Sequence, residues 1–279
     1  MDIARRLLRG FTVFTLGSGA AALCFYAVRV ILARWLDPAQ YGLVFSIIAF
    51  YSLILTYRML GFGTAFVRFV PEFKLAGDWW KVKSAAVQML AIQVAVVALV
   101  SAAVIAGRGF LAASYFKVPE ASVLLVAFLP YFWITVFGDT LENILYAFNR
   151  IGTFAWKKFL DQAFLLVFVV LLFPWFEDAR VMAAGMAAAA LFSTIWLATR
   201  YVRSLPEVRA APFSWDWKLF RKIFDFGLPQ TFANTGIALF TYIDTLLLTY
   251  FKTLTDVALY NVALPISLLL MYFRKPLIV

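Results

Sequence analysis

The sequence predicts an all-α integral membrane protein with about eight transmembrane helices. Of its 279 residues, 64% are hydrophobic and 14% are charged, and the mean hydropathy is +0.88. A water-soluble domain of this composition would leave too much apolar surface uncovered. The apolar runs are continuous rather than alternating, so they are typical of helices and not of barrel strands.

Eight uncharged runs give the expected helices. Most are close to the ~20 residues that a helix needs to cross about 30 Å of hydrocarbon, and the shorter ones extend past a single charge into further apolar sequence. The runs cover residues 10–28, 38–57, 84–107, 121–138, 162–176, 181–199, 226–243 and 257–273.

The first half of the chain begins with two helices, expected at 11–35 and 41–63. A basic loop follows at 68–83, in which Trp79 and its neighbour are expected to anchor the chain at the membrane surface. The third helix, 84–107, carries no charge at all. It is therefore expected to have a large lipid contact.

The fourth helix carries Pro130 in mid-span, the fifth begins near Phe154, and the sixth covers 182–199. The longest loop comes next and contains two prolines and several charges. We therefore divide the chain into a six-helix membrane lobe at 1–205, a cytoplasmic linker loop at 206–222 and the first two helices of a second lobe at 223–279.

An internal repeat supports this division. The segment 29–46 returns at 244–261, with a shift of 215 residues before the turn and 216 after it, and we assign the extra residue to the turn. A charge occupies the matching position in each copy, Arg29 in the first and Asp244 in the second. Repeats made of membrane helices are typical of transporters.

The distribution of basic residues predicts the orientation. Most of the 25 Lys and Arg residues fall in alternate loops, which by the positive-inside rule places the N-terminus in the cytoplasm and the protein in the cytoplasmic (inner) membrane. The net charge of +10 then indicates membrane lipids as partners, and not nucleic acid. The lone Cys24 lies inside the first run, so no disulfide framework is expected, and that run continues too far for a cleaved signal peptide.

The sequence lacks the residue patterns that mark common classes of enzyme active site. The chain has no histidine, no carboxylate or cysteine cluster with metal-ligand spacing, and no glycine-rich phosphate loop after a strand. We therefore expect neither enzymatic activity nor a metal site nor a cofactor.

Charges inside the expected helices are the first candidates for a functional site, because a charge near mid-bilayer costs about 2.5–3.5 kcal/mol on insertion scales. Arg29 lies eight residues before Asp37, hence ~12 Å from the end of its helix at 1.5 Å per residue. Asp244 lies eight residues before Lys252, at a similar depth. One hypothesis is that the two face each other across a cavity and pair when its outer side is shut. The alternative is that each is satisfied within its own lobe or extends to the surface.

A second group of intramembrane charges comprises Arg58, Asp139 and Glu142. The two acids are three residues apart and share a helix face. Arg58 approaches the cytoplasmic side at a similar depth, so a structural ion pair with Asp139 or Glu142 is expected as readily as a role in gripping phosphate. The acids are also candidates for a cation or proton site that couples transport.

Two amides, Gln230 and Asn234, share a face near the start of the seventh helix. They are candidates for hydrogen bonds to sugar hydroxyls, and contacts between helices explain them equally well.

Several short motifs carry a family resemblance: Asp37-Pro38-x-x-Tyr41-Gly42, the segment LGFGTAFVR at 60–68, FGLP at 226–229, YIDT at 242–245 and ALYN at 258–261. With them the chain resembles the polysaccharide exporter family, which includes Wzx-type flippases of lipid-linked oligosaccharides. The resemblance extends to the superfamily that also holds multidrug and toxin extrusion transporters and the lipid II flippase.

This resemblance implies twelve to fourteen helices in two six-helix lobes around a central cavity, so the chain is expected to be a fragment or a truncated form. It implies a flippase that moves a polyprenyl-diphosphate-linked oligosaccharide by alternating access, with glycosyltransferases or a polymerase of the same pathway as partners. By resemblance to the lipid II flippase, Arg29 and Arg58 are expected to line the cavity. The candidates for substrate binding are then Arg29, Arg58, Gln230, Asn234 and Asp244, and the anionic diphosphate is expected to compete with Asp244 for Arg29. A cation-coupled drug antiporter of the same superfamily is the alternative, and it would use acidic cavity residues.

Overall fold

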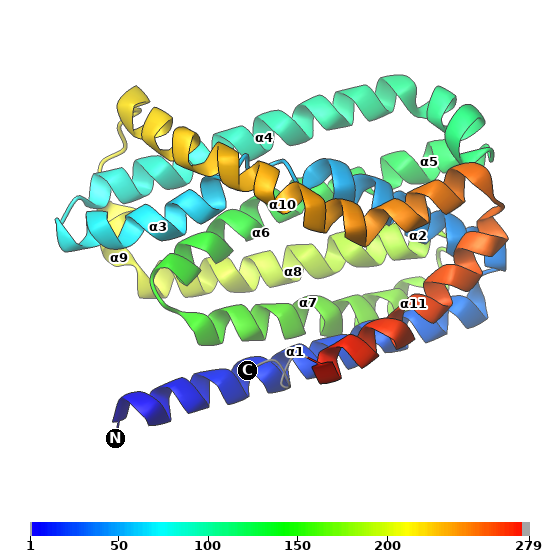
Figure 1. Ribbon diagram of the computed structural model, residues 1–279, viewed down its shortest axis with the longest axis horizontal. Helices are drawn as coiled ribbons and strands as arrows, with labels where there is room; N and C mark the ends of the chain where they lie inside the picture. The colour runs from blue at the N-terminus through cyan, green and yellow to red at the C-terminus, as the bar shows by residue number, and fades with distance from the viewer. Residues whose placement is uncertain (1, 275–279) are drawn as a thin grey trace.

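Long apolar runs fold into long helices that lie side by side, as the computed structural model shows (Figure 1). The structure describes the backbone of residues 2–274, with the side chains of 2–16, 151, 155, 234 and 266–274 left out. Within the part described, there is no β-strand.

The chain forms eleven α-helices in this range, with one π-helical segment between α4 and α5. Their bounds are α1 Asp2–Trp35, α2 Pro38–Leu55, α3 Phe62–Leu75, α4 Trp79–Phe110, the π-helix η1 Leu111–Phe116, α5 Glu120–Ala127, α6 Leu129–Ala147, α7 Ile151–Leu172, α8 Arg180–Ser204, α9 Pro206–Ala210, α10 Trp217–Phe251 and α11 Leu254–Arg274.

All eight predicted spans lie in helical stretches, and the all-α membrane fold is confirmed. Among the described residues, five stretches are long and apolar enough to cross a membrane: Gly17–Trp35, Pro38–Leu55, Trp79–Phe116, Glu120–Ala147 and Arg180–Ser204. The bent helix α10 makes a sixth. Helix α7 is long enough, but three charged residues lie in its first turns, at 157, 158 and 161.

The predicted second helix, 41–63, is interrupted. Helix α2 ends at Leu55, and turns occupy 56–61 before α3 begins. Two successive residues there, Leu60 and Gly61, have positive φ angles of 44° and 75°, a conformation that no α-helix accommodates. Arg58 therefore lies in a break between helices, and most of the predicted loop 68–83 is helical.

Pro130 lies inside the span Glu120–Ala147, as the sequence predicts, and occupies the first turn of α6, where its missing N–H costs nothing. One other boundary differs from the sequence prediction. Helix α10 begins at Trp217, inside the predicted linker, because the Asp216 side chain accepts hydrogen bonds from the Lys218 and Leu219 amides and caps the helix. The rest of that linker includes the short helix α9.

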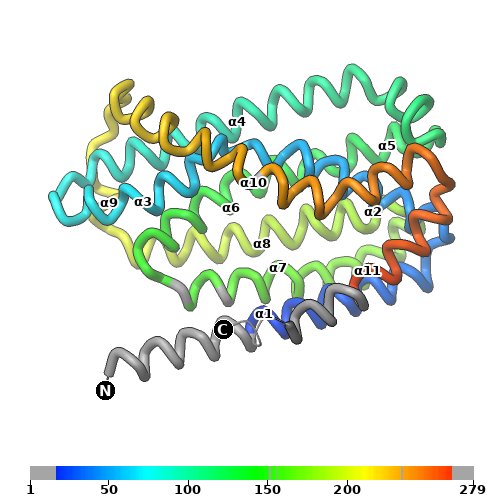
Figure 2. The backbone as a smooth tube through the Cα atoms, viewed as in Figure 1, coloured from blue at the N-terminus to red at the C-terminus, as the bar shows by residue number. Residues whose placement is uncertain are grey.

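Helix α2 lies at the centre of the packing. Residues 41–47 are buried without interruption, as expected for a helix that is covered all round. It packs against α10 and α11, while α1, α7, α8 and α6 pack one against the next on the other side. Figure 2 follows the same arrangement along the backbone, with α10 lying across α2 and α3.

The two copies of the repeat form the same supersecondary unit. Two residues separate α1 from α2, and two separate α10 from α11. The residues before α2 and α11, Asp37 and Thr253, both use a side-chain oxygen to accept an amide hydrogen bond from three residues ahead. The turns therefore have equal length, and the extra residue predicted in the turn lies instead before it. We call this side of the bundle the turn end.

Helix α10 contacts the first lobe at both of its ends. Near the turn end, the Ser46 and Thr249 hydroxyls are 2.7 Å apart, and Gly42 lies so close to α11 that a Cβ there would be 1.9 Å from the Leu254 carbonyl oxygen. At the opposite end, a Cβ on Gly61 would be 1.8 Å from the carbonyl oxygen of Gly227. At Gly42 and at Gly61, backbone therefore approaches backbone.

Candidate functional site

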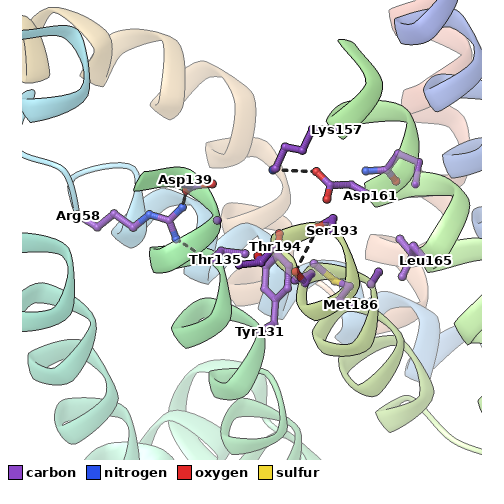
Figure 3. A pocket seen from close by; sticks show the side chains of 14 residues that line it. Arg58, Tyr131, Thr135, Asp139, Lys157, Asp161, Leu165, Met186, Ser193 and Thr194 are labelled. Carbon is purple, nitrogen blue, oxygen red and sulfur yellow. Dashed lines mark hydrogen bonds and ion pairs between the residues drawn. The ribbon is translucent and has the colours of Figure 1, made fainter. Parts of the chain in front are cut away.

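A charged cavity of about 120 Å³ lies inside the first lobe, between the 56–61 break and helices α6, α7 and α8. That volume is room for a few water molecules. It is lined by Arg58, Tyr131, Thr135, Gly138, Asp139, Lys157, Asp161, Gln162, Leu165, Met186, Ala189, Ala190, Ser193 and Thr194. Figure 3 shows Arg58 entering from one side and Lys157 and Asp161 from the other.

Arg58 is held by α6. Its guanidinium forms an ion pair with Asp139 and donates a hydrogen bond of 2.9 Å to the Thr135 hydroxyl. The side chains of Arg58 and Asp139 are only 14% and 19% exposed. Of the two ion pairs that the sequence left open for Arg58, the structure forms the one with Asp139.

Glu142 has a different partner. Although Asp139 and Glu142 share one helix, Glu142 contacts Lys157 of α7, whose ammonium lies 2.9 Å from it and 2.8 Å from Asp161. Lys157 thus bridges two carboxylates. The sequence analysis assigned no role to Lys157 and Asp161, although their spacing of four in a largely apolar helix is the signal for one shared face.

Carboxylates outnumber cations in this cluster. With every group ionised, Asp139, Glu142 and Asp161 carry three negative charges against the two positive charges of Arg58 and Lys157. The side-chain oxygen of Gln162 is buried and has no hydrogen-bond partner in the part of the chain that the structure describes. The cavity is therefore polar, with two cations and two carboxylates in its lining, and Glu142 adds a third carboxylate to the ion-pair cluster beside it.

Arg29 lies elsewhere, where the two helical hairpins meet at the turn end. Its Nη1 donates a hydrogen bond of 2.6 Å to the backbone carbonyl of Asn261 in α11. Its guanidinium also lies over two aromatic rings, 4.3 Å from the centre of Phe45 and 5.0 Å from that of Phe25. None of the ion pairs among the described residues includes Arg29, so this half-buried cation has no carboxylate beside it.

The structure does not bring Arg29 and Asp244 together. Asp244 is exposed and accepts a hydrogen bond of 3.0 Å from the Tyr260 hydroxyl, within its own hairpin. The cause is the position of the extra residue: counted back from the ends of α1 and α10, Arg29 matches Thr245, because both lie six residues before the helix end. Asp244 is one residue away, and one residue turns the side chain by about 100°.

Of the two predicted amides, the structure describes the side chain of Gln230. Gln230 is exposed on α10, next to Pro229. The side chain of Asn234 lies outside the described residues.

Comparison with known proteins agrees with the membrane-transporter fold. The family model of polysaccharide biosynthesis proteins matches residues 7–278. An uncharacterized membrane protein of Methanocaldococcus jannaschii is 22% identical over 98% of this chain, which spans 56% of that relative's length.

A solved structure, described as the inward-facing conformation of a multidrug resistance MATE family transporter of the MOP superfamily, aligns with a TM-score of 0.67. The alignment covers 92% of this chain and 58% of the other, at 16% identity. The chain thus spans little more than half the length of the proteins it resembles. It is a multi-pass membrane protein with the fold of a transporter.

Proposed function

The chain belongs to the family of polysaccharide biosynthesis proteins, and from this premise we propose that it serves to move a lipid-diphosphate-linked oligosaccharide across the cytoplasmic membrane. The lobes would rock about the binding site, exposing it to one side and then to the other, while the prenyl chain stays in lipid. Glycosyltransferases or a polymerase acting on the same glycan would be its partners. The loop charges favour an N-terminus in the cytoplasm.

The observation that carries this proposal is Arg29. A half-buried guanidinium without a carboxylate beside it is suited to an anionic ligand, and its planar fork matches phosphate oxygens. Its position is also suitable, because it lies where the hairpin α1–α2 meets α11. Opening of this contact would expose the cation.

A transport assay tests the proposal. The full protein is reconstituted in proteoliposomes with a lipid-linked oligosaccharide, and the fraction of glycan that becomes accessible to an enzyme outside the vesicles is followed in time. We expect transport by the unaltered protein and its loss in Arg29→Gln. Arg34→Gln is the matched control, because Arg34 is exposed on the same helix and should be dispensable. No glycan translocation by the unaltered protein would refute the proposal.

A cation-coupled antiporter is the second candidate, and the charged cavity favours it. Three carboxylates against two cations leave a net negative charge that a proton would neutralise. The same vesicles separate the two functions: an antiporter would move a cationic drug only with a proton or cation gradient, and Glu142→Gln would abolish that dependence. Glycan movement that needs no gradient would favour the carrier.

A further inference from the structure

The two hairpins meet through equivalent positions. Adding 216 to Arg29 and Phe45 gives Thr245 and Asn261. In the first hairpin, Arg29 lies over the Phe45 ring, and in the second, the Asn261 amide donates to the Thr245 hydroxyl at 3.4 Å. Arg29 then crosses from the first unit to the second, since it donates to the carbonyl of Asn261. One side chain therefore links the matched sites of both repeats.

In the arrangement that the structure shows, which we call closed, two polar groups at this link have no hydrogen-bond partner among the described residues. The Nε of Arg29 and the hydroxyl of Tyr41 are both buried, and neither has a hydrogen-bond partner among the residues described. Tyr41 is only 2% exposed. Phe45 contacts both side chains: its ring centre lies 4.7 Å from that of Tyr41 and 4.3 Å from the Arg29 guanidinium. A buried donor without a partner costs about 1–3 kcal/mol, so the closed contact carries a cost that a suitable ligand would remove.

The other polar contacts that hold α10 to α2 and to η1 near the turn end are satisfied. Thr249 donates to the Thr245 carbonyl and lies 2.7 Å from the Ser46 hydroxyl, and Tyr115 donates to the Leu246 carbonyl at 2.9 Å. A ligand gains nothing by exchanging these bonds. Arg29 differs, because it has a spare donor and no counter-charge.

We propose that Arg29 and Tyr41 form a phosphate site that competes with the Asn261 carbonyl, so that binding of the phosphate releases the hairpin α10–α11 from α1 and α2. The phosphate oxygens would take the Nη1 donor from Asn261 and supply partners for Nε and for the Tyr41 hydroxyl. The ligand is the phosphate group of a lipid or of a free diphosphate. This inference rests on the proposed carrier function. It adds that the phosphate of the substrate breaks the Arg29–Asn261 contact, which otherwise holds the two hairpins together at the turn end.

The energetics follow from differential binding. A phosphate that binds only when the hairpin α10–α11 is released shifts the equilibrium toward the released state, whereas a ligand that binds both states equally shifts nothing. Coupling between two such events is worth about 5–150-fold in typical cases. We therefore expect phosphate to lower the closed population at the turn end by at least about fivefold.

Disulfide formation reports the closed population directly. The chain's one cysteine, Cys24, is first replaced by alanine. A new cysteine pair is then introduced by Ser46→Cys and Thr249→Cys, because the two hydroxyl oxygens lie 2.7 Å apart. The full protein in nanodiscs of neutral lipid is treated with a mild oxidant, and the intact mass after thiol blocking gives the rate of disulfide formation. Pyrophosphate, farnesyl diphosphate and sulfate at equal ionic strength are compared.

With Arg29 in place, we expect farnesyl diphosphate to slow disulfide formation by at least about fivefold. If pyrophosphate acts equally, the phosphate group alone is recognised, and if only farnesyl diphosphate acts, the site serves the lipid head group. Arg29→Gln should abolish the effect, and Tyr41→Phe should weaken it without slowing the reaction in the absence of ligand. Tyr115→Phe is the matched control: it loosens the same contact, slows the ligand-free reaction and leaves the ratio between the two rates unchanged.

Three results would overturn the proposal: no slowing with Arg29 in place, equal slowing in Arg29→Gln, or equal slowing by sulfate, which would be a salt effect. The disulfide in the ligand-free variants also shows that they are folded. This measurement does not depend on transport. An Arg29-dependent response in a protein that translocates no glycan would therefore refute the carrier function and keep the phosphate site.

Discussion

Replacing Gly61 by alanine tests the contact between α3 and α10 at the end of the bundle opposite the turns. Two effects add at this position. The φ angle of +75° is a left-handed conformation, which costs a residue with a Cβ about 1–2 kcal/mol. The new Cβ would also lie 1.8 Å from the Gly227 carbonyl oxygen, whereas real Cβ atoms stay at least 3.0 Å away, so the backbones must separate by 3.0 − 1.8 = 1.2 Å. Overpacking of this kind costs about 1–3 kcal/mol.

The expected total for Gly61→Ala is about 2–5 kcal/mol of stability, the sum of the strain and overpacking terms. Three other glycines separate the two terms. Gly77 has φ +74° and no atom near its Cβ position, so Gly77→Ala should show the strain alone. Gly227 is helical, and a Cβ there would lie 2.6 Å from the Gly61 carbonyl group, so Gly227→Ala should show an overlap without the backbone strain. Gly236, in the same helix with open space around it, should gain about 0.5–1 kcal/mol as alanine.

Equilibrium unfolding in mixed micelles, with increasing sodium dodecyl sulfate and tryptophan fluorescence as the signal, measures all four variants. The reasoning fails if Gly61→Ala and Gly77→Ala lose the same stability, because the backbone overlap would then contribute nothing. It fails also if Gly227→Ala and Gly236→Ala change the free energy of unfolding by the same amount.

Further predictions concern single polar groups. Asp139→Asn should cost about 3–5 kcal/mol, because Arg58 would stay buried without its counter-charge, and the double variant with Arg58→Gln should cost less than the sum of the singles in the same unfolding measurement. Tyr51 and Tyr41 are both buried in α2, but only Tyr51 donates a hydrogen bond, 2.7 Å long, to the Leu125 carbonyl. Tyr51→Phe should therefore lose about 1 kcal/mol and Tyr41→Phe none, and equal losses would contradict the assignment. Hydrogen bonds from Thr253 lower the pKa of Asp256 at the start of α11 below its ordinary 3.8, so the contribution of this cap is present above that value and is lost as the pH falls through the lowered pKa. Carboxyl NMR titration should show the pKa returning toward 3.8 in Thr253→Ala, and no change would argue against the cap.

The apolar runs were sufficient to predict the membrane class and the eight helical stretches, because hydrocarbon leaves the backbone few alternatives. The break after α2 could not be predicted in the same way. Leu60 and Gly61 continue an apolar run, and nothing local requires a positive φ there. The close approach of Gly61 to Gly227, far away in the sequence, accompanies that conformation. Tertiary contact thus decides a feature that also places Arg58 at the cavity.

The sequence could not predict which acid pairs with which cation at the cavity, for a similar reason. Spacing put Asp139 and Glu142 on one face, and one conclusion drawn from it, an ion pair with Arg58, has a counterpart in the structure. The other, a site for a coupling cation or proton, stays a prediction. Which acid takes which cation depends on the rotation of α6 between the 56–61 break on one side and α7 on the other. A difference of three residues along a helix turns a side chain by about 300°, so the two carboxylates diverge by about 60° and reach different neighbours.

The comparison of Arg29 with Asp244 shows how sensitive a repeat is to its register. When the two repeats are aligned on the apolar residues before the turn, Arg29 matches Asp244, and this alignment predicts mirror-image sites. Aligned on the helix ends, whose turns have equal length, Arg29 matches Thr245, and Thr245 and Asn261 are the residues found next to the arginine's contact. Because one residue of offset rotates a helical side chain by about 100°, it moved the predicted partner from the interface to an exposed face. The two hairpins therefore match in position and not in charge, and the unmatched Arg29 is the cation that the proposed phosphate site uses.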